Sequence, residues 1–290
     1  PVWLWYYHAG YRENWNKREW NDPAMKRPFD DYMKEALEKR WWDVRDRPAE
    51  NVPPRVIMEC GGDYLRRTRG GQSMLLEHLW PKLKMFVSID WRLNTAGLHS
   101  DIFLPAAHHY EKITFHIPTP HHRQLTLSDQ AVPPAGESKP EWEIWVLLAK
   151  KIEERAKARG FPRYKDSRGF EYCLDNLYDQ MTLNGELAEL PALADEMVQD
   201  TVLTGSLPEG TTLDTFREKG YVRFIDWGIS AYALGQASDF RLDETHNPFR
   251  WHTEKKLPYN TLTRRAQFYI DHDWFLEAGE ELPTHKETPP

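Results

Sequence analysis

The chain has 290 residues, of which 40% are hydrophobic and 29% are charged, and 38 Lys and Arg against 45 Asp and Glu give a net charge of −7. Its 13 Trp, 13 Tyr and 12 Phe supply enough apolar surface for a core, which excludes a disordered chain. The mild acidity argues against a nucleic-acid surface, and a mean hydropathy of −0.74 without a long apolar run argues against a membrane span.

The first third of the chain alternates strand-like and helix-like segments. A continuous apolar run predicts a strand at Val2–Tyr7. Short, mostly apolar segments predict further strands at Arg55–Cys60, Met85–Asp90 and, as a short fourth, Asp101–Leu104. Apolar residues at helical spacing predict helices over Phe29–Trp42 and Gln72–Trp80. Strands separated by helices imply crossover connections and a parallel sheet, so the expected fold class is α/β. Ligands of such sheets bind at the carboxyl ends of the strands.

The rest of the chain is less regular. Residues 106–134 are rich in His and Pro and predict loops. A helix is expected over Trp142–Arg159, because Ser138–Glu141 has the spacing of a capping box and Gly160 stands where a helix stops. Shorter elements are predicted as helices at Asp195–Val202 and Thr211–Lys219 and as a strand at the end of Thr261–Ile270. The C-terminal half is therefore expected to be irregular, mostly helical and loop.

The pair Gly61-Gly62 follows the second predicted strand and is the first candidate binding element. Without side chains there, backbone N–H groups can approach a phosphate closely. Three arginines follow at Arg66, Arg67 and Arg69, and Gly70-Gly71 opens the next helix, whose N-terminus also favours an anion. The alternative is an ordinary glycine turn with solvated arginines.

The next strand end carries Asp90 and Arg92. A carboxylate at this place can accept hydrogen bonds from a ribose or from the amino groups of a guanine base. The alternative is an aspartate that caps the following turn or helix.

Five histidines lie within fifteen positions, at His108, His109, His116, His121 and His122, with Glu111 among them. Imidazole and carboxylate groups are natural ligands of zinc or non-haem iron, but no established ligand spacing is present. We expect loop-surface or pocket-lining histidines and no metal site in this chain. No nucleophile elbow accompanies a serine, and neither cysteine has an evident local partner.

Two cysteines, Cys60 and Cys173, are too few for a disulfide framework, a four-thiolate zinc site or an iron–sulfur cradle within this chain. The sequence starts at Pro1 rather than Met and shows no leader, and its end, Thr284–Pro290, has the composition of a linker. The chain is therefore expected to be an internal fragment of a longer protein.

Three segments in order along the chain resemble landmarks of the molybdopterin-dependent oxidoreductases of the dimethyl-sulfoxide-reductase superfamily. Ser100–Lys112, SDIFLPAAHHYEK, is similar to the SDIvLPaa…YEK segment of that superfamily, and Ala135–Ile144, AGESKPEWEI, is similar to the gEsKsDWeI stretch of its nitrate-reductase-like branch. Tyr259–His272 and Glu281–Lys286 resemble a later landmark of the same branch. The aromatic opening and the HHYEK variant look most like the alpha subunits of ethylbenzene dehydrogenase and steroid side-chain dehydrogenases.

The resemblance implies a Rossmann-like α/β region over residues 1–160 that binds part of a bis(molybdopterin guanine dinucleotide) molybdenum cofactor. Residues 161–290 would then pack on it and lead to a C-terminal domain outside this chain. Carried over from the family, Gly61, Gly62 and Asp63 would face the pyrophosphate, and Asp90, Arg92 and Thr95 would hold the nucleoside. The family often has Asn at the position of Asp63. Because a carboxylate repels a pyrophosphate, the neighbouring backbone is the better expected contact there.

The resemblance also implies a function and an assembly. The expected activity is that of a hydrocarbon or steroid side-chain dehydrogenase that adds a water-derived hydroxyl group, with no catalytic residue identified in this chain. The alternatives are an oxyanion reductase of the nitrate, perchlorate or selenate type and a stand-alone nucleotide-binding protein without catalysis. A [4Fe–4S] cluster held outside this chain, an iron–sulfur beta subunit, a haem gamma subunit and a periplasmic location are expected of the full enzyme, with a cytoplasmic location as the alternative.

Overall fold

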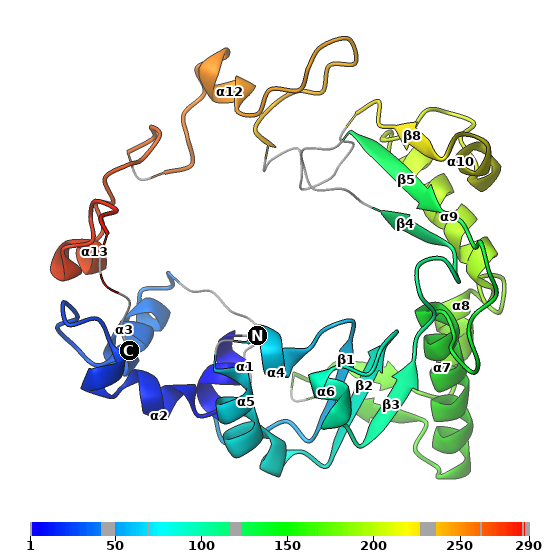
Figure 1. Cartoon of the computed structure of the whole chain (residues 1–290), viewed down its shortest axis with the longest axis horizontal. Helices are drawn as coiled ribbons and strands as arrows, with labels where there is room; N and C mark the ends of the chain where they lie inside the picture. Colours follow the sequence, from blue (N-terminus) through cyan, green and yellow to red (C-terminus); the bar gives the residue numbers. More distant parts are fainter. Residues whose placement is uncertain are drawn as a thin grey trace. The chain divides into compact units, whose positions relative to one another are not determined.

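The computed structural model of the chain (Figure 1) describes residues 2–41, 50–68, 70–116, 123–166, 168–226, 236–261, 263–285 and 287. The chain divides into two compact units, which are described separately. Unit 1 comprises Pro1–Leu104 and Pro258–Pro290, and unit 2 comprises Pro105–Leu257. The two units therefore do not coincide with the expected regions 1–160 and 161–290.

The sheet of unit 1 has three strands, β1 (Val56–Cys60), β2 (Met85–Asp90) and β3 (Ile102–Pro105), in the order β1-β2-β3. Strands β1 and β2 run parallel, with Val56 opposite Met85 and Cys60 opposite Ile89. Five of the six residues of β2 are buried, as expected for a strand covered on both faces. The expected α/β class and these three strands are confirmed, whereas the Rossmann-like topology stays a prediction.

Short helical segments connect the strands of unit 1. The stretch between β1 and β2 holds α4 (Tyr64–Arg67), α5 (Gly71–Met74), the π-helical turn η2 (Leu75–Leu79) and the 3-10 turn η3 (Trp80–Lys82). Helix α6 (Thr95–Leu98) follows β2. The predicted helix over Gln72–Trp80 is thus confirmed as a broken helical stretch.

The strand predicted at Val2–Tyr7 is wrong, because this run forms helix α1 (Val2–His8). Three further helical segments follow it, α2 (Tyr11–Trp15), the 3-10 turn η1 (Arg18–Trp20) and α3 (Phe29–Glu38). A short apolar run without a period cannot be told from a buried helix turn by its pattern alone. In the helix, Tyr6 is 1% exposed and its hydroxyl donates a hydrogen bond to Asp30 of α3.

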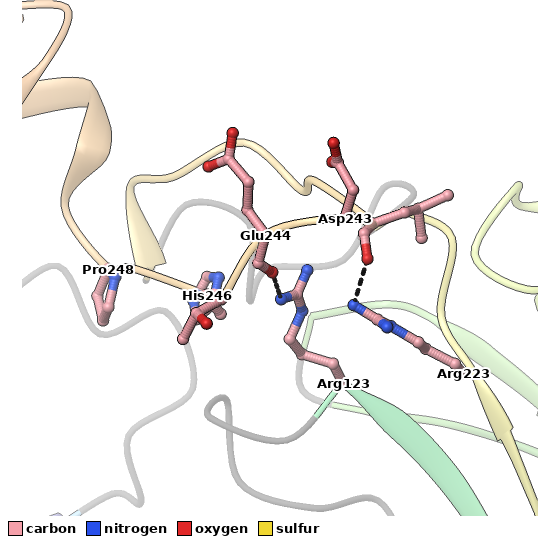
Figure 2. Close-up of a pocket in the computed structure, with 8 residues that line it drawn as sticks. Arg123, Arg223, Asp243, Glu244, His246 and Pro248 are labelled. Atoms are coloured by element: carbon pink, nitrogen blue, oxygen red, sulfur yellow. Dashed lines mark hydrogen bonds between the residues drawn. The ribbon is translucent and has the colours of Figure 1, made fainter.

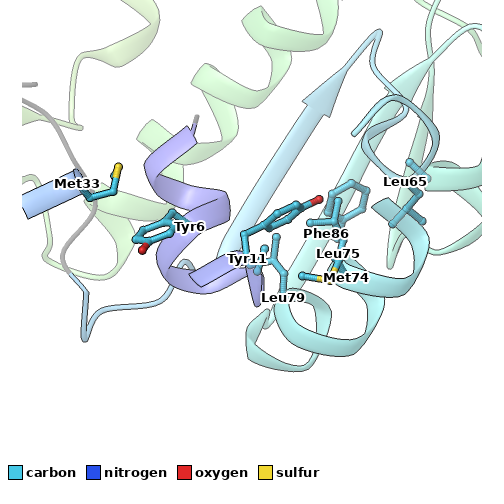
Figure 3. Packing of buried hydrophobic residues seen from close by; sticks show 10 residues of the cluster. Tyr6, Tyr11, Met33, Leu65, Met74, Leu75, Leu79 and Phe86 are labelled. Carbon is cyan, nitrogen blue, oxygen red and sulfur yellow. The ribbon is translucent and has the colours of Figure 1, made fainter. Parts of the chain in front are cut away.

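The core of unit 1 forms between these N-terminal helices and the β1–β2 crossover (Figure 3). Its buried members are Tyr6, Ala9, Tyr11, Met33, Leu65, Met74, Leu75, Leu79, Phe86 and Ala96. The three leucines come from the helical segments that follow β1, and Phe86 comes from β2. The aromatic start of the chain therefore serves the core of the same unit as the parallel strands.

Helix α13 (Asp273–Ala278) packs on α3 although the two helices lie at opposite ends of the chain. The Trp274 ring lies edge-on to Tyr32, with ring centroids 5.1 Å apart, and its Nε1–H donates to Glu35 Oε2 over 2.9 Å. Hydrogen bonds from Lys39, Trp274 and Arg27 lower the pKa of Glu35 from 4.5 to about 2. The predicted helix from Phe29 is confirmed as far as Glu38; Trp42 lies outside the described residues.

The substitution Trp274→Phe is expected to loosen α13 from α3. It keeps an aromatic ring but removes the hydrogen-bond donor to the Glu35 carboxylate. Hydrogen exchange of the α13 amides measures the loss. Trp20→Phe changes a half-exposed tryptophan of the same unit and serves as the control. Unchanged exchange in the Trp274 variant would contradict a role for this bond.

Unit 2 contains a second, antiparallel sheet of β4 (Thr114–His116), β5 (Gln124–Ser128) and β8 (Tyr221–Arg223), in the order β4-β5-β8. The expectation of loops throughout residues 106–134 is wrong where β4 and β5 lie. The strands are short, and the segment between them carries turn-forming prolines that obscure the alternation of a strand. Leu125, Val198, Leu207, Phe216 and Val222 are the buried core of this part.

The remaining elements of unit 2 are mostly helical. They are α7 (Glu141–Ala158), the hairpin β6 (Arg163–Lys165) and β7 (Glu171–Cys173), α8 (Leu177–Thr182), α9 (Leu190–Leu203), α10 (Leu213–Lys219) and α12 (Arg250–Thr253). The helices predicted for α7, α9 and α10 are confirmed. In unit 1, the strand expected at the end of Thr261–Ile270 is wrong, because no described residue of that segment forms one.

The predicted capping box before α7 is also wrong. Pro140 is the N-cap residue and no side chain caps it, while Ser138 Oγ donates to the carbonyl of Ala135. At the other end, Gly160 has φ +63° and its N–H donates to Lys157 O, so the expected glycine stop is confirmed. Among the described residues, no helix combines the length and the apolar character that a membrane crossing requires.

Candidate site at the carboxyl ends of the parallel strands

The two predicted binding loops meet at the carboxyl ends of β1 and β2. The Gly61 N–H donates to Ile89 O over 2.9 Å, and the Ala96 N–H donates to Asp63 Oδ1 over 3.2 Å. The loop after β1 therefore contacts both the end of β2 and the helix that follows it. This is the neighbourhood that the order of the parallel strands predicts.

Glu59, which the sequence reasoning missed, is a buried residue that accepts hydrogen bonds from the backbone of the glycine loop. Its side chain is buried, with 2% exposure, and its Oε1 accepts hydrogen bonds from the backbone N–H groups of Asp63 and Tyr64. These two amides belong to the segment that was expected to face a pyrophosphate. The signal in the sequence is an acidic residue inside an apolar strand, two positions before a glycine pair.

The environment of Glu59 disfavours its charged form. Burial raises the pKa of its carboxyl above 4.5, and the nearby carboxylates of Asp63 and Asp90 raise it further, against a hydrogen bond from the Tyr64 amide. Glu59 Oε2 and the Oγ of Ser88, the residue opposite it on β2, are both buried without a hydrogen-bond partner among the described residues.

Gly61 and Gly62 each require a glycine, but for different structural reasons. A Cβ at Gly62 would overlap Glu59 Oε1 and lie 2.8 Å from its Cδ, so Gly62 makes room for the buried carboxyl group. Gly61 has φ +64° with no atom within 4 Å of the position of a Cβ, so its need is conformational. Asp63 also has a positive φ, +139°, which a non-glycine residue rarely adopts.

Asp90 supports the turn after β2. It is 7% exposed, its Oδ1 accepts from the Trp91 N–H over 2.7 Å and its Oδ2 accepts from Asn94 Nδ2 over 2.8 Å. Asn94 Oδ1 in turn accepts from the Gly97 N–H and caps α6. The turn-supporting alternative for Asp90 thus describes its contacts in this structure, and each carboxylate oxygen keeps further acceptor capacity.

The other two predicted nucleoside contacts lie on the same loop. Arg92 is exposed, and its guanidinium carbon lies 4.8 Å from the centre of the Trp91 ring. Thr95 is half-buried and is the first residue of α6. The structure therefore brings Gly61, Asp63, Asp90 and Thr95 into one neighbourhood, with Arg92 at its exposed side.

The amides of Asp63 and Tyr64 are not free to bind a pyrophosphate, which leaves the exposed arginine side chains as the cationic groups of this loop. Those amides are engaged by Glu59, and the Gly71 N–H at the start of α5 donates to Thr68 O. Arg66 and Arg67 of α4 are exposed, and the space beside Gly61 is open. Arg69 lies outside the described residues.

The histidines of unit 2 do not form a metal site in the described part of the chain. His109 lies between His108 and His116, with ring centroids 5.3 Å and 5.7 Å away, but no described cluster of three or more His, Cys, Asp or Glu could hold an ion. Burial, Lys112 and the two neighbouring imidazoles lower the pKa of His109. His121 and His122 lie outside the described residues.

Comparison with known proteins supports the same family as the sequence motifs. Residues 69–151 match the sequence profile of the family described as molybdopterin oxidoreductase. This segment contains η2, β2, the loop of Asp90, β3 and most of α7. It therefore includes one of the two loops of the candidate site.

Three curated relatives are similar over most of the chain. The respiratory nitrate reductase subunit alpha of Haloferax mediterranei is 34% identical over 100% of this chain, the perchlorate reductase subunit alpha of Dechloromonas aromatica is 33% identical over 92%, and the chlorate reductase subunit alpha of Ideonella dechloratans is 34% identical over 81%. The chain spans only 29%, 27% and 24% of the lengths of these relatives. Residues 69–151 of the chain are thus similar to the molybdopterin oxidoreductase family.

Proposed function

We propose that this chain is a central segment of the catalytic alpha subunit of a molybdenum enzyme that reduces an oxyanion of the nitrate, perchlorate, chlorate or selenate class. The observation that carries the proposal is the similarity, over 81% to 100% of the chain, to three alpha subunits that are named as oxyanion reductases. These relatives favour the oxyanion alternative over the hydrocarbon or steroid side-chain dehydrogenase that the sequence motifs first suggested.

The proposed role of this chain is to bind one guanine dinucleotide of a bis(molybdopterin guanine dinucleotide) cofactor. When bound, the molybdenum group supplies the redox chemistry, and the protein supplies binding and orientation. Arg66 and Arg67 would contact the phosphates, since both guanidinium groups are exposed beside an open glycine turn. Asp90 and Thr95 would hold the nucleoside.

The rest of the assembly follows from the same proposal. A [4Fe–4S] cluster would be ligated outside this chain, because the chain has two cysteines, Cys60 and Cys173, and such a cluster takes four thiolates. An iron–sulfur beta subunit and a haem gamma subunit would carry electrons to the alpha subunit. The proposed location of the assembly is the periplasm.

A substrate panel on the purified full-length enzyme tests the activity. We expect a molybdenum-containing protein that oxidises a reduced viologen dye when nitrate, chlorate, perchlorate or selenate is added. Ethylbenzene, a sterol and dimethyl sulfide, assayed with an electron acceptor, are the comparison substrates. Turnover of ethylbenzene or the sterol without oxyanion reduction would restore the dehydrogenase interpretation. A protein that binds guanine nucleotide tightly but contains no molybdenum would favour the stand-alone nucleotide-binding protein.

Replacement of Arg66 and Arg67 by alanine tests the cofactor contact independently of catalysis. We expect the molybdenum and the guanine nucleotide that co-purify with the enzyme to fall about tenfold under dilute conditions, because a hydrogen bond to a charged group contributes roughly 1.5–3 kcal/mol. Arg155→Ala with Arg159→Ala removes two exposed arginines of unit 2 and is the matched control. Equal cofactor content in both double variants would contradict the assignment of Arg66 and Arg67.

A further inference from the structure

An open cavity of about 580 Å³ lies in unit 2, where the ends of β5 and β8 face the loop of residues 242–248 (Figure 2). Arg123 immediately precedes β5, and Arg223 is the last residue of β8. The strand pairing places Arg223 opposite Gln124, the neighbour of Arg123, so both arginines reach the same end of the sheet. Asp243, His246 and Pro248 line the opposite side.

Among the described residues, the hydrogen bonds of both arginines go to main-chain carbonyl groups of residues 241–244, and the Arg123 guanidinium carbon also lies 4.4 Å from the centre of the Phe240 ring. Arg123 donates from Nη1 to Glu244 O over 2.8 Å and from Nη2 to Arg241 O, and Arg223 donates from Nη2 to Leu242 O over 2.7 Å. No carboxylate among the described residues forms an ion pair with either arginine. Their positive charges are therefore positioned by the loop but not neutralised by it.

The other arginines of this region are paired differently. Arg241 and Arg250 form ion pairs with Glu244 and Glu254. Figure 2 shows the carboxylate groups of Asp243 and Glu244 pointing away from the two cavity guanidinium groups, whereas the Glu244 carbonyl points toward Arg123. The carboxylates of Asp243 and Glu244 therefore do not neutralise the guanidinium groups of Arg123 and Arg223.

The environment of Arg123 disfavours the positive charge of its guanidinium group. Burial, followed by the positive charges of Arg223 and Arg250, lowers the pKa of the Arg123 guanidinium. Its Nε is buried and has no hydrogen-bond partner among the described residues. Among those residues, Arg223 uses only its Nη2 in a protein hydrogen bond, which leaves further donors of its planar guanidinium for a ligand. An anion between the two groups would relieve their mutual repulsion and accept these hydrogen bonds.

We propose that this cavity binds a small inorganic oxyanion or a phosphate group between Arg123 and Arg223. Planar guanidinium groups match the geometry of trigonal and tetrahedral oxyanions, and His246, whose Nε2 lies 3.2 Å from Gln236 Oε1, adds a polar group to the wall. The site lies within unit 2 and depends on none of the residues assigned to the dinucleotide, so it stands or falls separately from the proposed function.

Calorimetric titration of the full-length protein with nitrate, chlorate, inorganic phosphate or sulfate tests the site, with chloride as the control for ionic strength. We expect saturable binding of at least one oxyanion, at least tenfold weaker in Arg223→Gln and partly retained in Arg223→Lys. Tighter binding of phosphate and sulfate would identify a phosphate-class ligand, and tighter binding of nitrate and chlorate a monovalent oxyanion.

The control variant is Arg163→Gln, which removes an exposed arginine of the β6–β7 hairpin in the same unit and should bind as the unaltered protein does. Thermal unfolding checks that Arg223→Gln is folded, and it is expected to be, because it loses a single hydrogen bond at an exposed residue. Equal oxyanion affinity in Arg223→Gln and Arg163→Gln, or no difference between oxyanions and chloride, would overturn the site.

Discussion

Replacing Gly62 with alanine is expected to lower the free energy of unfolding of unit 1 by about 3 kcal/mol, because the new methyl group takes the place of the Glu59 carboxyl group. Glu59 is 2% exposed and cannot move toward solvent without releasing the N–H groups of Asp63 and Tyr64. Each buried donor left without an acceptor costs roughly 1–3 kcal/mol. Urea unfolding followed by tryptophan fluorescence measures the change.

Gly61→Ala is the matched control. It adds the same methyl group one residue earlier, where φ is +64° and no atom lies within 4 Å, so only the conformational cost of roughly 1 kcal/mol is expected. Combining Gly62→Ala with Glu59→Ala should cost less than the sum of the two single changes, because the methyl group then enters vacated space. A Gly62→Ala variant as stable as Gly61→Ala would contradict the contact with Glu59.

The parallel strands of unit 1 could be predicted because a strand's apolar composition reflects its burial in the sheet. A strand covered on both faces is rich in apolar residues, and Met85–Asp90 has four among its six residues and is buried almost throughout. The run Val2–Tyr7 is apolar as well but forms a helix, whose Tyr6 bonds Asp30, 24 residues away along the chain, and shares a core with Met33. Composition shows that a run is buried, whereas its backbone conformation depends on the elements that bury it.

The same distinction applies to the candidate site. That the loops of Gly61 and Asp90 adjoin follows from strand order, and the structure brings them together through Asp63 and Ala96. Which groups the loop amides bind does not follow from strand order, because it depends on local backbone dihedral angles and on the depth of Glu59. The cavity of Arg123 and Arg223 was missed for a similar reason, since it requires β5 to pair with the distant strand β8.

Glu59 is expected to make unit 1 less stable as the pH rises, relative to a Glu59→Gln variant. Burial raises the folded-state pKa of this carboxyl above its ordinary 4.5. Between pH 4.5 and the folded-state pKa, the folded protein holds a proton on Glu59 that the unfolded chain has released. The free energy of unfolding therefore falls with increasing pH in this window. Glutamine keeps an acceptor for the Asp63 and Tyr64 amides but does not titrate.

Chemical unfolding of the two proteins across a pH series from below 4.5 upward measures the difference. The stability advantage of Glu59→Gln should grow as the pH rises through this window and level off above the folded-state pKa. Glu38→Gln removes an exposed carboxylate of the same unit and controls for the change in net charge. If the amide hydrogen bonds outweighed burial, the folded-state pKa would instead lie below 4.5, and Glu59→Gln would lose relative stability with increasing pH. Glu59→Met offers no acceptor of comparable strength and leaves both amides without a partner, so it should be about 3 kcal/mol less stable than Glu59→Gln at every pH.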